Sequence, residues 1–450
     1  MAPPERGDTI THSVQILKEP LANDHVPRVP VFLDASATQP LTLPVPPSLL
    51  LPFLDQLRRN GGIMCAGLLA EACGGAKEEG PAEAAHDMAW EQLHTGAWHS
   101  VPLVWRDAFS LSCLCLASHR QYARQLDQAL RYLDLGVMMG GPLFRSALDA
   151  AIVSFQDTVG NSDREEHLIG LGAEGHEENG GLSDEEGKEA VLDCLPHGSL
   201  QYKFVEKQCN PSLEVFLCNY LLPGLPVIVT DAMSHWPALT KWNDFKYLQK
   251  IAGNRTIPVE VGEHYLAEGW RQELMTLSQL MERWHTRLGC SSKEQLYLAQ
   301  HPLFDQIPQL RSDIVIPDYC SVGGGELHSI NAWLGPAGTI TPLHHDPHHN
   351  FLAQVVGRKY VRLYSHQASE CLYPYAEAML CNSSQVDLNN PDNKQWPEAQ
   401  GLKFVDCILE EGQMLYIPPK WWHYVQSLSP SFSVSFWWTT DDNDNGGHSI

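Results

Sequence analysis

The chain has 450 residues, enough for two or three domains, and 43% of them are hydrophobic, which can fill at least one large core. Lys and Arg total 30 against 54 Asp and Glu, giving a formal charge of −24 at pH 7. This excess of acid, without a basic patch, argues against direct binding to nucleic acid and favours basic proteins or peptides as partners. No run approaches the roughly 18 apolar residues of a membrane span, and the N-terminus lacks the apolar segment of a signal peptide.

Two N-terminal segments differ sharply in pattern. Residues 1–48 are rich in proline, end in PLTLPVPPS and predict a flexible lead-in. Residues 49–156 carry apolar side chains at spacings of three and four, which predicts a helical module. One such ladder consists of Trp105, Phe109, Cys113 and Leu116.

The tryptophans of this module have two interpretations. Trp90, Trp98 and Trp105 can form a stripe that binds a partner, but aromatic residues in a helical segment more often belong to the core, and we favour the core. No internal repeat is found at a fixed period, although a repeat-type pair of antiparallel helices stays open.

An acidic segment follows over residues 157–195. Between positions 157 and 193 it holds 12 acids against 2 bases, with glycines interspersed. Such a composition cannot bury enough apolar surface to fold, so we expect a disordered linker, and a dedicated acidic docking arm is the alternative. This segment supplies much of the negative charge of the whole chain.

The remainder is predicted to be mainly β. Branched and aromatic runs alternate with Gly, Pro, Asn and Asp turns, which indicates a sandwich or a small antiparallel barrel over residues 196–438. Residues 439–450 are polar and predict a disordered tail. The expected strands lie within residues 225–231, 255–262, 351–365, 412–425 and 431–438, and the run 351–365 predicts a hairpin that turns near Gly357.

The stretch TPLHHDPHHN, residues 341–350, predicts a metal site. In an extended strand, His344 and Asp346 share a face while His345 points away. His423 in IPPKWWHYV can supply a third ligand. Two imidazoles and one carboxylate on one face form the triad that leaves positions open on Fe(II). The remaining histidines of the stretch, His345, His348 and His349, are expected at the surface or behind the ligands.

A co-substrate acid would need a cation and hydroxyl groups nearby. Lys359 lies 13 residues after Asp346, and its ammonium can bind the far carboxylate of 2-oxoglutarate. Thr341 and Tyr297 are candidate hydroxyl donors, and Asn350 is a candidate amide donor. The alternative for Lys359 is a solvated strand residue.

These residues carry a resemblance. NAWLGPAGTITPLHHDPHHNFLAQVVGRKYVRLYS and LYIPPKWWHYVQSLSPSFSVSFWW resemble the JmjC branch of Fe(II)/2-oxoglutarate oxygenases, as do PVEVG, YLAQHPLFDQIPQL and IPDYCS. The likeness covers roughly residues 196–438 and extends faintly into the helical module. It implies a double-stranded β-helix, the jelly-roll or cupin-like JmjC barrel, with flanking helices. It also implies Fe(II) ligation by His344, Asp346 and His423, and 2-oxoglutarate binding by Tyr297, Thr341, Asn350, Lys359, Trp333 and Trp437.

The resemblance implies oxidation of a protein side chain with O2 as a second co-substrate. We expect hydroxylation of an arginine, with methyl-lysine demethylation of histones or histone-tail proteolysis as alternatives within the family. A cationic side chain needs acids and aromatics beside the metal, for which Glu260, Tyr265 and Trp270 are candidates. The expected substrate is a histone tail or another basic ribosomal or chromatin-associated protein, and the expected location is the nucleus, with the cytoplasm second.

Two alternatives lie outside this chemistry. A barrel with a structural ion can act as a non-catalytic interaction protein through its helical module. The other alternative is a zinc peptidase, but the chain holds no H-E-x-x-H motif.

Overall fold

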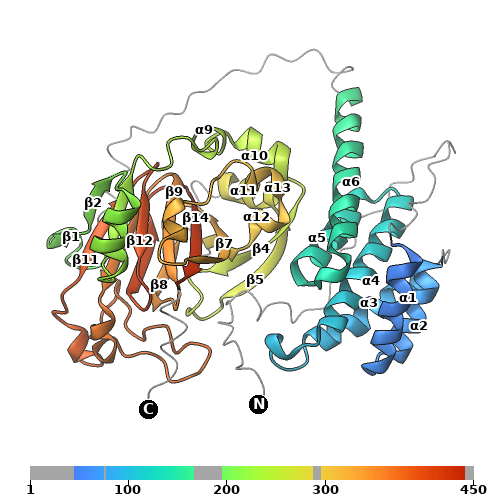
Figure 1. Cartoon of the computed structure of the whole chain (residues 1–450), viewed down its shortest axis with the longest axis horizontal. Coiled ribbons are helices and arrows are strands. Elements are labelled where there is room, and N and C mark those ends of the chain that lie inside the picture. The colour runs from blue at the N-terminus through green and yellow to red at the C-terminus, as the bar shows by residue number, and fades with distance from the viewer. Residues whose placement is uncertain (1–44, 75–77, 167–194, 287–294, 441–450) are drawn as a thin grey trace. The chain divides into compact units, whose positions relative to one another are not determined.

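Two units make up the fold. The computed structural model describes residues 45–74, 78–166, 195–286 and 295–440, and contacts along the chain divide them into a helical unit and a β-rich unit (Figure 1). The helical unit also includes the short segment Asn254–Thr256. Among these residues, no helix combines the length and the apolarity needed to cross a bilayer.

The helical unit is organised around α4. This helix is buried over most of its length because its neighbours pack around it, and the ladder predicted from the sequence lies in its core. Of the three tryptophans, Trp105 is buried, whereas Trp90 and Trp98 are only partly so. The α-helices of the unit are α1 (Pro47–Arg59), α2 (Ile63–Cys73), α3 (Gly80–Leu93), α4 (Leu103–Tyr122), α5 (Leu126–Met139) and α6 (Arg145–Glu166).

Helix α6 extends into the segment expected to be disordered. Leu148, Ala151, Ile152 and Phe155 are buried at helical spacing and anchor its first half. Once this half is nucleated by packing, adding polar residues costs little, so the helix continues to Glu166. The prediction of a linker beginning at residue 157 is therefore wrong for residues 157–166, and residues 167–194 lie outside the described part. The predicted lead-in over residues 1–48 also extends too far, because α1 begins at Pro47.

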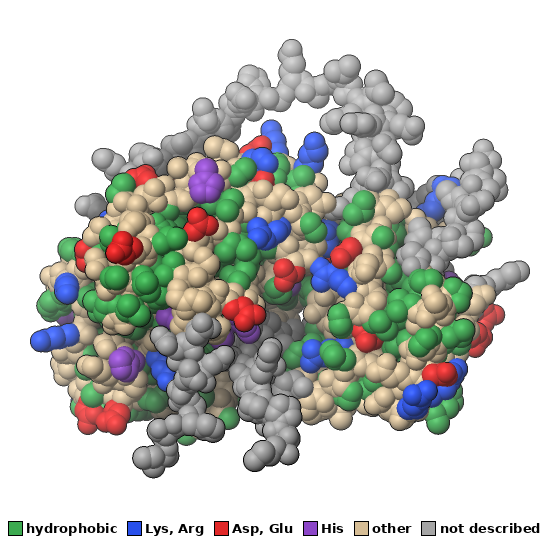
Figure 2. Space-filling model, in the orientation of Figure 1, with side chains coloured by type: hydrophobic (Ala, Val, Ile, Leu, Met, Phe, Trp, Pro, Cys, Tyr) green, Lys and Arg blue, Asp and Glu red, His purple; other side chains and the backbone are tan. Residues whose placement is uncertain are grey.

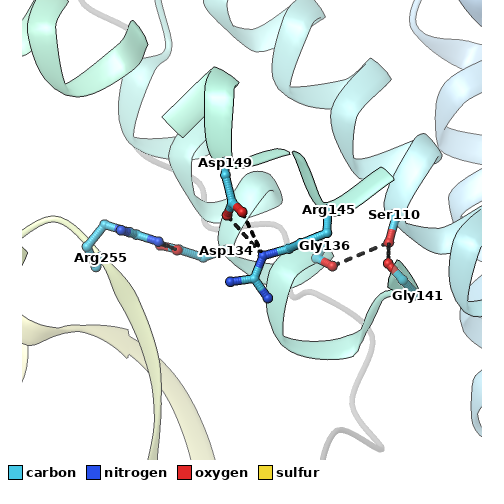
Figure 3. A network of polar contacts seen from close by, with 7 residues as sticks. All are labelled: Ser110, Asp134, Gly136, Gly141, Arg145, Asp149 and Arg255. Carbon is cyan, nitrogen blue, oxygen red and sulfur yellow. Dashed lines mark hydrogen bonds and ion pairs between the residues drawn. The ribbon is translucent and has the colours of Figure 1, made fainter. Parts of the chain in front are cut away.

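Polar contacts tie several segments of the helical unit together (Figure 3). The Ser110 hydroxyl lies 3.4 Å from the carbonyl oxygen of Gly136 and 3.3 Å from that of Gly141. Arg255 donates from Nη2 to Asp134 Oδ1 at 2.6 Å, and both side chains are buried. A buried ion pair of this kind fixes one geometry because either charge alone would be costly there.

The β-rich unit contains two sheets. One has five strands in the order β1-β11-β10-β13-β8, and the other has nine in the order β2-β3-β12-β9-β14-β7-β6-β4-β5. The strands are β1 (Lys203–Phe204), β2 (Glu206–Cys209), β3 (Val227–Thr230), β4 (Thr256–Gly262), β5 (Arg271–Thr276), β6 (Gln295–His301), β7 (Glu326–Gly335), β8 (Ile340–His345), β9 (His349–Val356), β10 (Lys359–Tyr364), β11 (Val405–Leu409), β12 (Met414–Ile417), β13 (Trp422–Ser427) and β14 (Ser431–Thr439).

Short helices cover the outer face of the nine-stranded sheet. Trp242 stacks on Phe432 of β14 at 4.3 Å between ring centroids, and Leu280 and Phe304 belong to the same apolar cluster. This layer leaves the other face of the sheet for the barrel interior. The α-helices of the unit are α8 (Leu213–Phe216), α9 (Ala238–Lys241), α10 (Phe245–Ala252), α11 (Leu277–Thr286), α12 (Leu303–Gln306) and α13 (Pro308–Arg311).

The inner faces of the two sheets meet in a second apolar core. Leu352 and Leu415 from the nine-stranded sheet pack with Val361, Leu363 and Val425 from the five-stranded sheet. Two facing, mostly antiparallel sheets with an apolar interior form the predicted double-stranded β-helix, and flanking helices complete it. The predicted fold class is confirmed.

The predicted hairpin over residues 351–365 is wrong. Strands β9 and β10 follow each other in sequence but lie in different sheets, where β9 pairs with β12 and β14 while β10 pairs with β11 and β13. The turn between them is a corner of the barrel. Gly357 occupies it at φ +74°, a backbone conformation that favours glycine.

We predict that Gly357→Ala destabilises the β-rich unit more than Gly412→Ala does. Both glycines have positive φ, but a Cβ at Gly357 would lie close to the carbonyl oxygen of Pro430, whereas a Cβ at Gly412 would have no atom within 4 Å. Left-handed strain alone costs about 1 kcal/mol, and displacing the Pro430 segment should bring the loss at Gly357 to about 3 kcal/mol. Urea unfolding of both variants measures the difference, and equal midpoints would contradict the prediction.

Candidate metal and co-substrate site

Strand pairing brings the three predicted metal ligands together. In the β8–β13 pair, His344 lies directly opposite His423, and their ring centroids are 4.1 Å apart. Asp346 follows β8 immediately, and its carbonyl oxygen accepts a hydrogen bond from the Lys420 amide in the turn before β13. The candidate ligand atoms of all three residues lie within 4.8 Å of one another.

Backbone carbonyls fix the orientation of both imidazoles. His344 Nδ1 lies 2.8 Å from the carbonyl oxygen of Pro342, and His423 Nδ1 lies 3.0 Å from that of Trp421. A carbonyl only accepts, so Nδ1 carries the proton in each ring and donates it. The Nε2 atoms are then left as lone-pair donors, which is how metal-binding histidines are commonly held.

Asp346 supplies the negative charge of the group. Burial acts to raise the pKa of this carboxyl, but a hydrogen bond from His423 and the charges of His423 and His344, when their rings are protonated, outweigh burial and lower the pKa to about 2. Asp346 Oδ2 lies 3.5 Å from His423 Nε2. A carboxylate that stays ionised next to two Nε2 lone pairs is a donor set suited to a divalent first-row metal, so the residues present fit Fe(II).

The other histidines of the motif face elsewhere. His345 packs edge-on against Trp422, which agrees with its expected opposite direction. His348 stacks on His328 at 4.4 Å between ring centroids. His349 is not a surface residue, because it is buried in β9 and its Nδ1 lies 2.8 Å from the Tyr416 hydroxyl. Burial lowers the pKa of His349 to about 4, so its ring is neutral at physiological pH.

A cavity extends from the ligands into the barrel. The space between its walls, counted together with the open mouth, is about 350 Å³. Most of the predicted co-substrate residues line it. The lining residues are Tyr297, Trp333, Thr341, His344, Asp346, Asn350, Leu352, Lys359, Ile417, His423 and Val425.

Lys359 is the cation at the inner end of this cavity. It is 1% exposed, and burial lowers the pKa of its ammonium to about 7. Its Nζ donates to the Tyr297 hydroxyl at 3.1 Å and lies 5.9 Å from the Trp333 ring centroid. The alternative of a solvated strand residue is therefore wrong. An ammonium buried among aromatics fits an anionic ligand, because a carboxylate would restore the stabilisation that water no longer provides.

Two further polar groups complete the cavity. Thr341 lies beside the Tyr297 hydroxyl, where it partly offsets the rise in the tyrosine pKa that burial causes. Asn350 is buried, and its Oδ1 has no hydrogen-bond partner among the described residues. A buried amide oxygen without a partner is costly, so this atom marks a place where a bound group can supply one.

The two predicted aromatic residues have different positions. Trp333 lines the cavity and its Nε1 donates to Ser435 Oγ at 2.9 Å. Trp437 is buried in β14 opposite Asn350, but it is not among the lining residues. The pairing of β14 with β7 shifts register between Trp437 and Trp438. The ring centroid of Trp437 lies 5.7 Å from that of His348.

The candidate substrate residues lie next to the cavity without lining it. Glu260 on β4 pairs with Tyr297 on β6, and burial raises the pKa of its carboxyl to about 7, with Trp270 partly opposing the rise. Tyr265 is joined to Ser383 by a 2.8 Å hydrogen bond between their hydroxyls. A half-buried carboxylate with aromatic neighbours is a suitable environment for a cationic side chain.

The apolar lining of the cavity and one loop beside it carry weaker signals in the sequence. Leu352 and Val425 follow Asn350 and His423 by two residues, so strand alternation could have placed them on the same faces. The loop over residues 365–404 carried no such signal, because it connects β10 to β11 through turns and short 3₁₀ helices.

This loop holds the free edge of β8. Asn382 Nδ2 donates to the carbonyl oxygen of His345 at 3.0 Å, and the His345 amide donates to that of Asn382 at 2.9 Å. The Ser384 amide donates to the carbonyl oxygen of Leu343 at 2.8 Å. The loop therefore supports the strand carrying His344 on the side opposite β13, and through Ser383 it contacts Tyr265.

Comparison with known proteins identifies the class. Residues 212–444 match the family described as a cupin-like domain, and residues 48–168 match the family described as KDM8-like, N-terminal ARM repeats. The chain belongs to the cupin-like JmjC oxygenases. The second match indicates that the helical module is built of repeats. No fixed period revealed them in the sequence, because the helices of such repeats share packing positions while their residues differ.

The relatives define the branch more closely. The chain is 53% identical over 400 residues to lysine-specific demethylase JMJ30 of Arabidopsis thaliana, with 86% of this chain and 92% of the relative covered. It is 38% identical to lysine-specific demethylase 8 of Xenopus tropicalis, with 78% and 87% covered. It is 35% identical to Jumonji C domain-containing protein 5 of Drosophila melanogaster, with 78% and 84% covered.

We predict that Asn382→Ala weakens metal binding by about tenfold, because the loop then holds β8 less firmly. Asp346→Ala should abolish binding, and Asn243→Ala, which removes an exposed amide bonded to Leu239, should leave it unchanged. Titration with Mn(II), followed by the electron paramagnetic resonance signal of the free ion, measures all three. Unchanged affinity in Asp346→Ala would contradict the metal site.

Proposed function

We propose that the protein is an Fe(II)- and 2-oxoglutarate-dependent oxygenase that acts on a cationic side chain of a protein, and that it demethylates N-methylated lysine. The observation that supports this most directly is the single cavity that joins the His344, Asp346 and His423 group to the buried ammonium of Lys359. When bound, Fe(II) and 2-oxoglutarate would supply activation of dioxygen. A peptidase or a purely structural ion would have no need of the buried lysine.

The residues of the cavity have separable tasks in this proposal. His344, Asp346 and His423 would hold the metal from one side and leave its other side open. Lys359 would bind the far carboxylate of 2-oxoglutarate, with the hydroxyls of Tyr297 and Thr341 beside it. Asn350 would donate from its Nδ2 to the same ligand.

The substrate side chain would enter from the side of Glu260. Its carboxyl has a pKa of about 7 because of burial, so a cation beside it would favour the ionised form. Tyr265 and Trp270 would add aromatic surface against the cation. The apolar lining residues Leu352, Ile417 and Val425 would keep water from the reacting carbon.

Lysine demethylation is the reading that the relatives favour. The plant and frog proteins are both named lysine-specific demethylases, and the chain covers most of the length of each. Oxidation of an N-methyl carbon gives an unstable carbinolamine, whose C–N bond breaks to leave the demethylated amine and formaldehyde. A histone tail is the substrate class that this reading implies, and it would place the action of the protein in the nucleus.

Arginine hydroxylation, our expectation from the sequence, remains the second candidate because of Glu260. A carboxylate binds best to a cation that has N–H groups to donate, as guanidinium has. A fully methylated lysine has none. Glu260 therefore favours arginine, or lysine with fewer methyl groups, over trimethyl-lysine.

We predict that 2-oxoglutarate binds about tenfold more weakly for each pH unit above 7. Lys359 has a pKa of about 7 without ligand, and the ligand requires the protonated form, so binding takes up a proton above this pH and none well below it. Titration of 2-oxoglutarate against the protein saturated with Mn(II), between pH 6.5 and 8.5, measures the slope. Lys359→Met should lose both the affinity and the slope, and a flat profile in the unchanged protein would contradict the role of Lys359.

We predict that Glu260→Gln lowers turnover of a basic peptide at least about tenfold while peptide-independent consumption of 2-oxoglutarate persists, because only the charge facing the substrate is removed. Glu263→Gln, at an exposed neighbour, is the matched control. Mass spectrometry of methyl-lysine and arginine peptides separates the two candidates, since methyl loss lowers the mass by about 14 Da and hydroxylation raises it by about 16 Da. Equal loss of both reactions in Glu260→Gln would remove this residue from substrate binding.

A further inference from the structure

We propose that Cys73 and Cys115 form a reversible oxidation site in the helical unit, in which a hydroperoxide converts the two thiols to a disulfide. The two Sγ atoms lie 3.7 Å apart although the residues are separated by 42 positions. The proposal is independent of the proposed function, because it concerns α2 and α4 and not the barrel.

Packing brings the two thiols together. Cys73 is the last residue of α2, whose buried residues Leu69 and Ala72 hold that helix in the core of the unit, and Cys115 lies in the central helix α4. A disulfide requires an Sγ–Sγ distance of about 2.05 Å. The remaining approach is shorter than 2 Å, within reach of side-chain rotation.

The two thiols differ in their access to solvent. Cys115 is 1% exposed, whereas Cys73 is partly exposed. The contact with Cys115 lowers the pKa of Cys73 despite burial, and the same contact together with burial raises the pKa of Cys115. Cys73 is therefore the thiol with the access to solvent that is needed to react first with a peroxide.

The reaction balances in two steps. The Cys73 thiolate attacks one oxygen of the hydroperoxide, the O–O bond breaks, and the product is a sulfenic acid with release of an alcohol, or of water when the oxidant is hydrogen peroxide. Cys115 Sγ then attacks the Cys73 sulfur, the S–O bond breaks, and the Cys115 proton leaves with the hydroxyl group as water. Two thiols are oxidised by two electrons, and one peroxide is reduced.

The disulfide would connect the end of α2 to the middle of α4. It closes a loop of 42 residues, which restricts the unfolded chain and should raise the melting temperature of the helical unit. Cys113 offers a matched control, since it is buried in α4 two residues from Cys115, and the described contacts of its side chain do not include Cys73.

The full-length protein is reduced, treated with increasing hydrogen peroxide, alkylated and digested for mass spectrometry. We expect a peptide pair linked through Cys73 and Cys115 with a loss of about 2 Da, reversed by dithiothreitol. The link should be absent in Cys73→Ser and present in Cys113→Ala. Circular dichroism of the reduced variants checks that they fold.

Two results would overturn the proposal. One is oxidation of Cys73 to sulfinic acid, a gain of about 32 Da, without the linked peptide. The other is an unlinked Cys73 at peroxide doses that oxidise the exposed thiols Cys209, Cys218 and Cys381.

Discussion

The register between β8 and β13 is the constraint on which the site depends. It places His344 opposite His423, although 79 positions separate them in the sequence. A shift of β8 by one residue would turn His344 out of the cavity and away from His423, because strand side chains alternate between faces. The Lys420 amide, bonded to the backbone of Asp346, fixes the same register from the turn. The metal group is thus a product of main-chain pairing before any ion is bound.

The second constraint is the cost of burying charge. Lys359 is held in a space that removes most of its hydration, and it has a hydroxyl and aromatic rings instead of a carboxylate as neighbours. Such a site stores unfavourable energy in the absence of ligand and releases it when an acid binds. Asn350 Oδ1 is also buried without a partner among the described residues, and as an acceptor it calls for a ligand group that donates. Polar groups that are poorly satisfied on their own are therefore an informative sign of what this cavity accepts.

Local periodicity predicted the parts of the fold that depend on local chemistry. The i, i+2 rule placed His344 and Asp346 on one face, and the helical ladder through Phe109 placed the core of the helical unit. The hairpin at Gly357 failed because a glycine corner and a hairpin turn have the same sequence signal, and only pairing with distant strands decides between them. The length of α6 failed because composition does not show that a packed first half can extend a polar helix.

Among the candidate site residues, those for which chemistry demands a particular group line the cavity, whereas those whose position depends on geometry do not all do so. Lys359, Thr341 and Tyr297 were accessible from the need for a cation and hydroxyls. Trp437 was expected in the cavity, but it is not among the lining residues, although its cross-strand partner Asn350 is. The support of β8 by Asn382 and Ser384 could not be predicted, since hydrogen bonds from a loop to the main chain of a distant strand have no signature in the local sequence.

That support has a consequence for how a polypeptide can approach the barrel. Strand β8 is an edge of the five-stranded sheet, and an open edge is a template on which another chain can add itself as a strand. Residues 382–384 already occupy its hydrogen-bonding groups along this edge. A peptide therefore cannot bind to this edge of β8 by adding itself as a further strand. Under the proposed function, selectivity would then come from what a single protruding side chain meets inside the cavity, so the sequence around the target residue should be recognised only loosely.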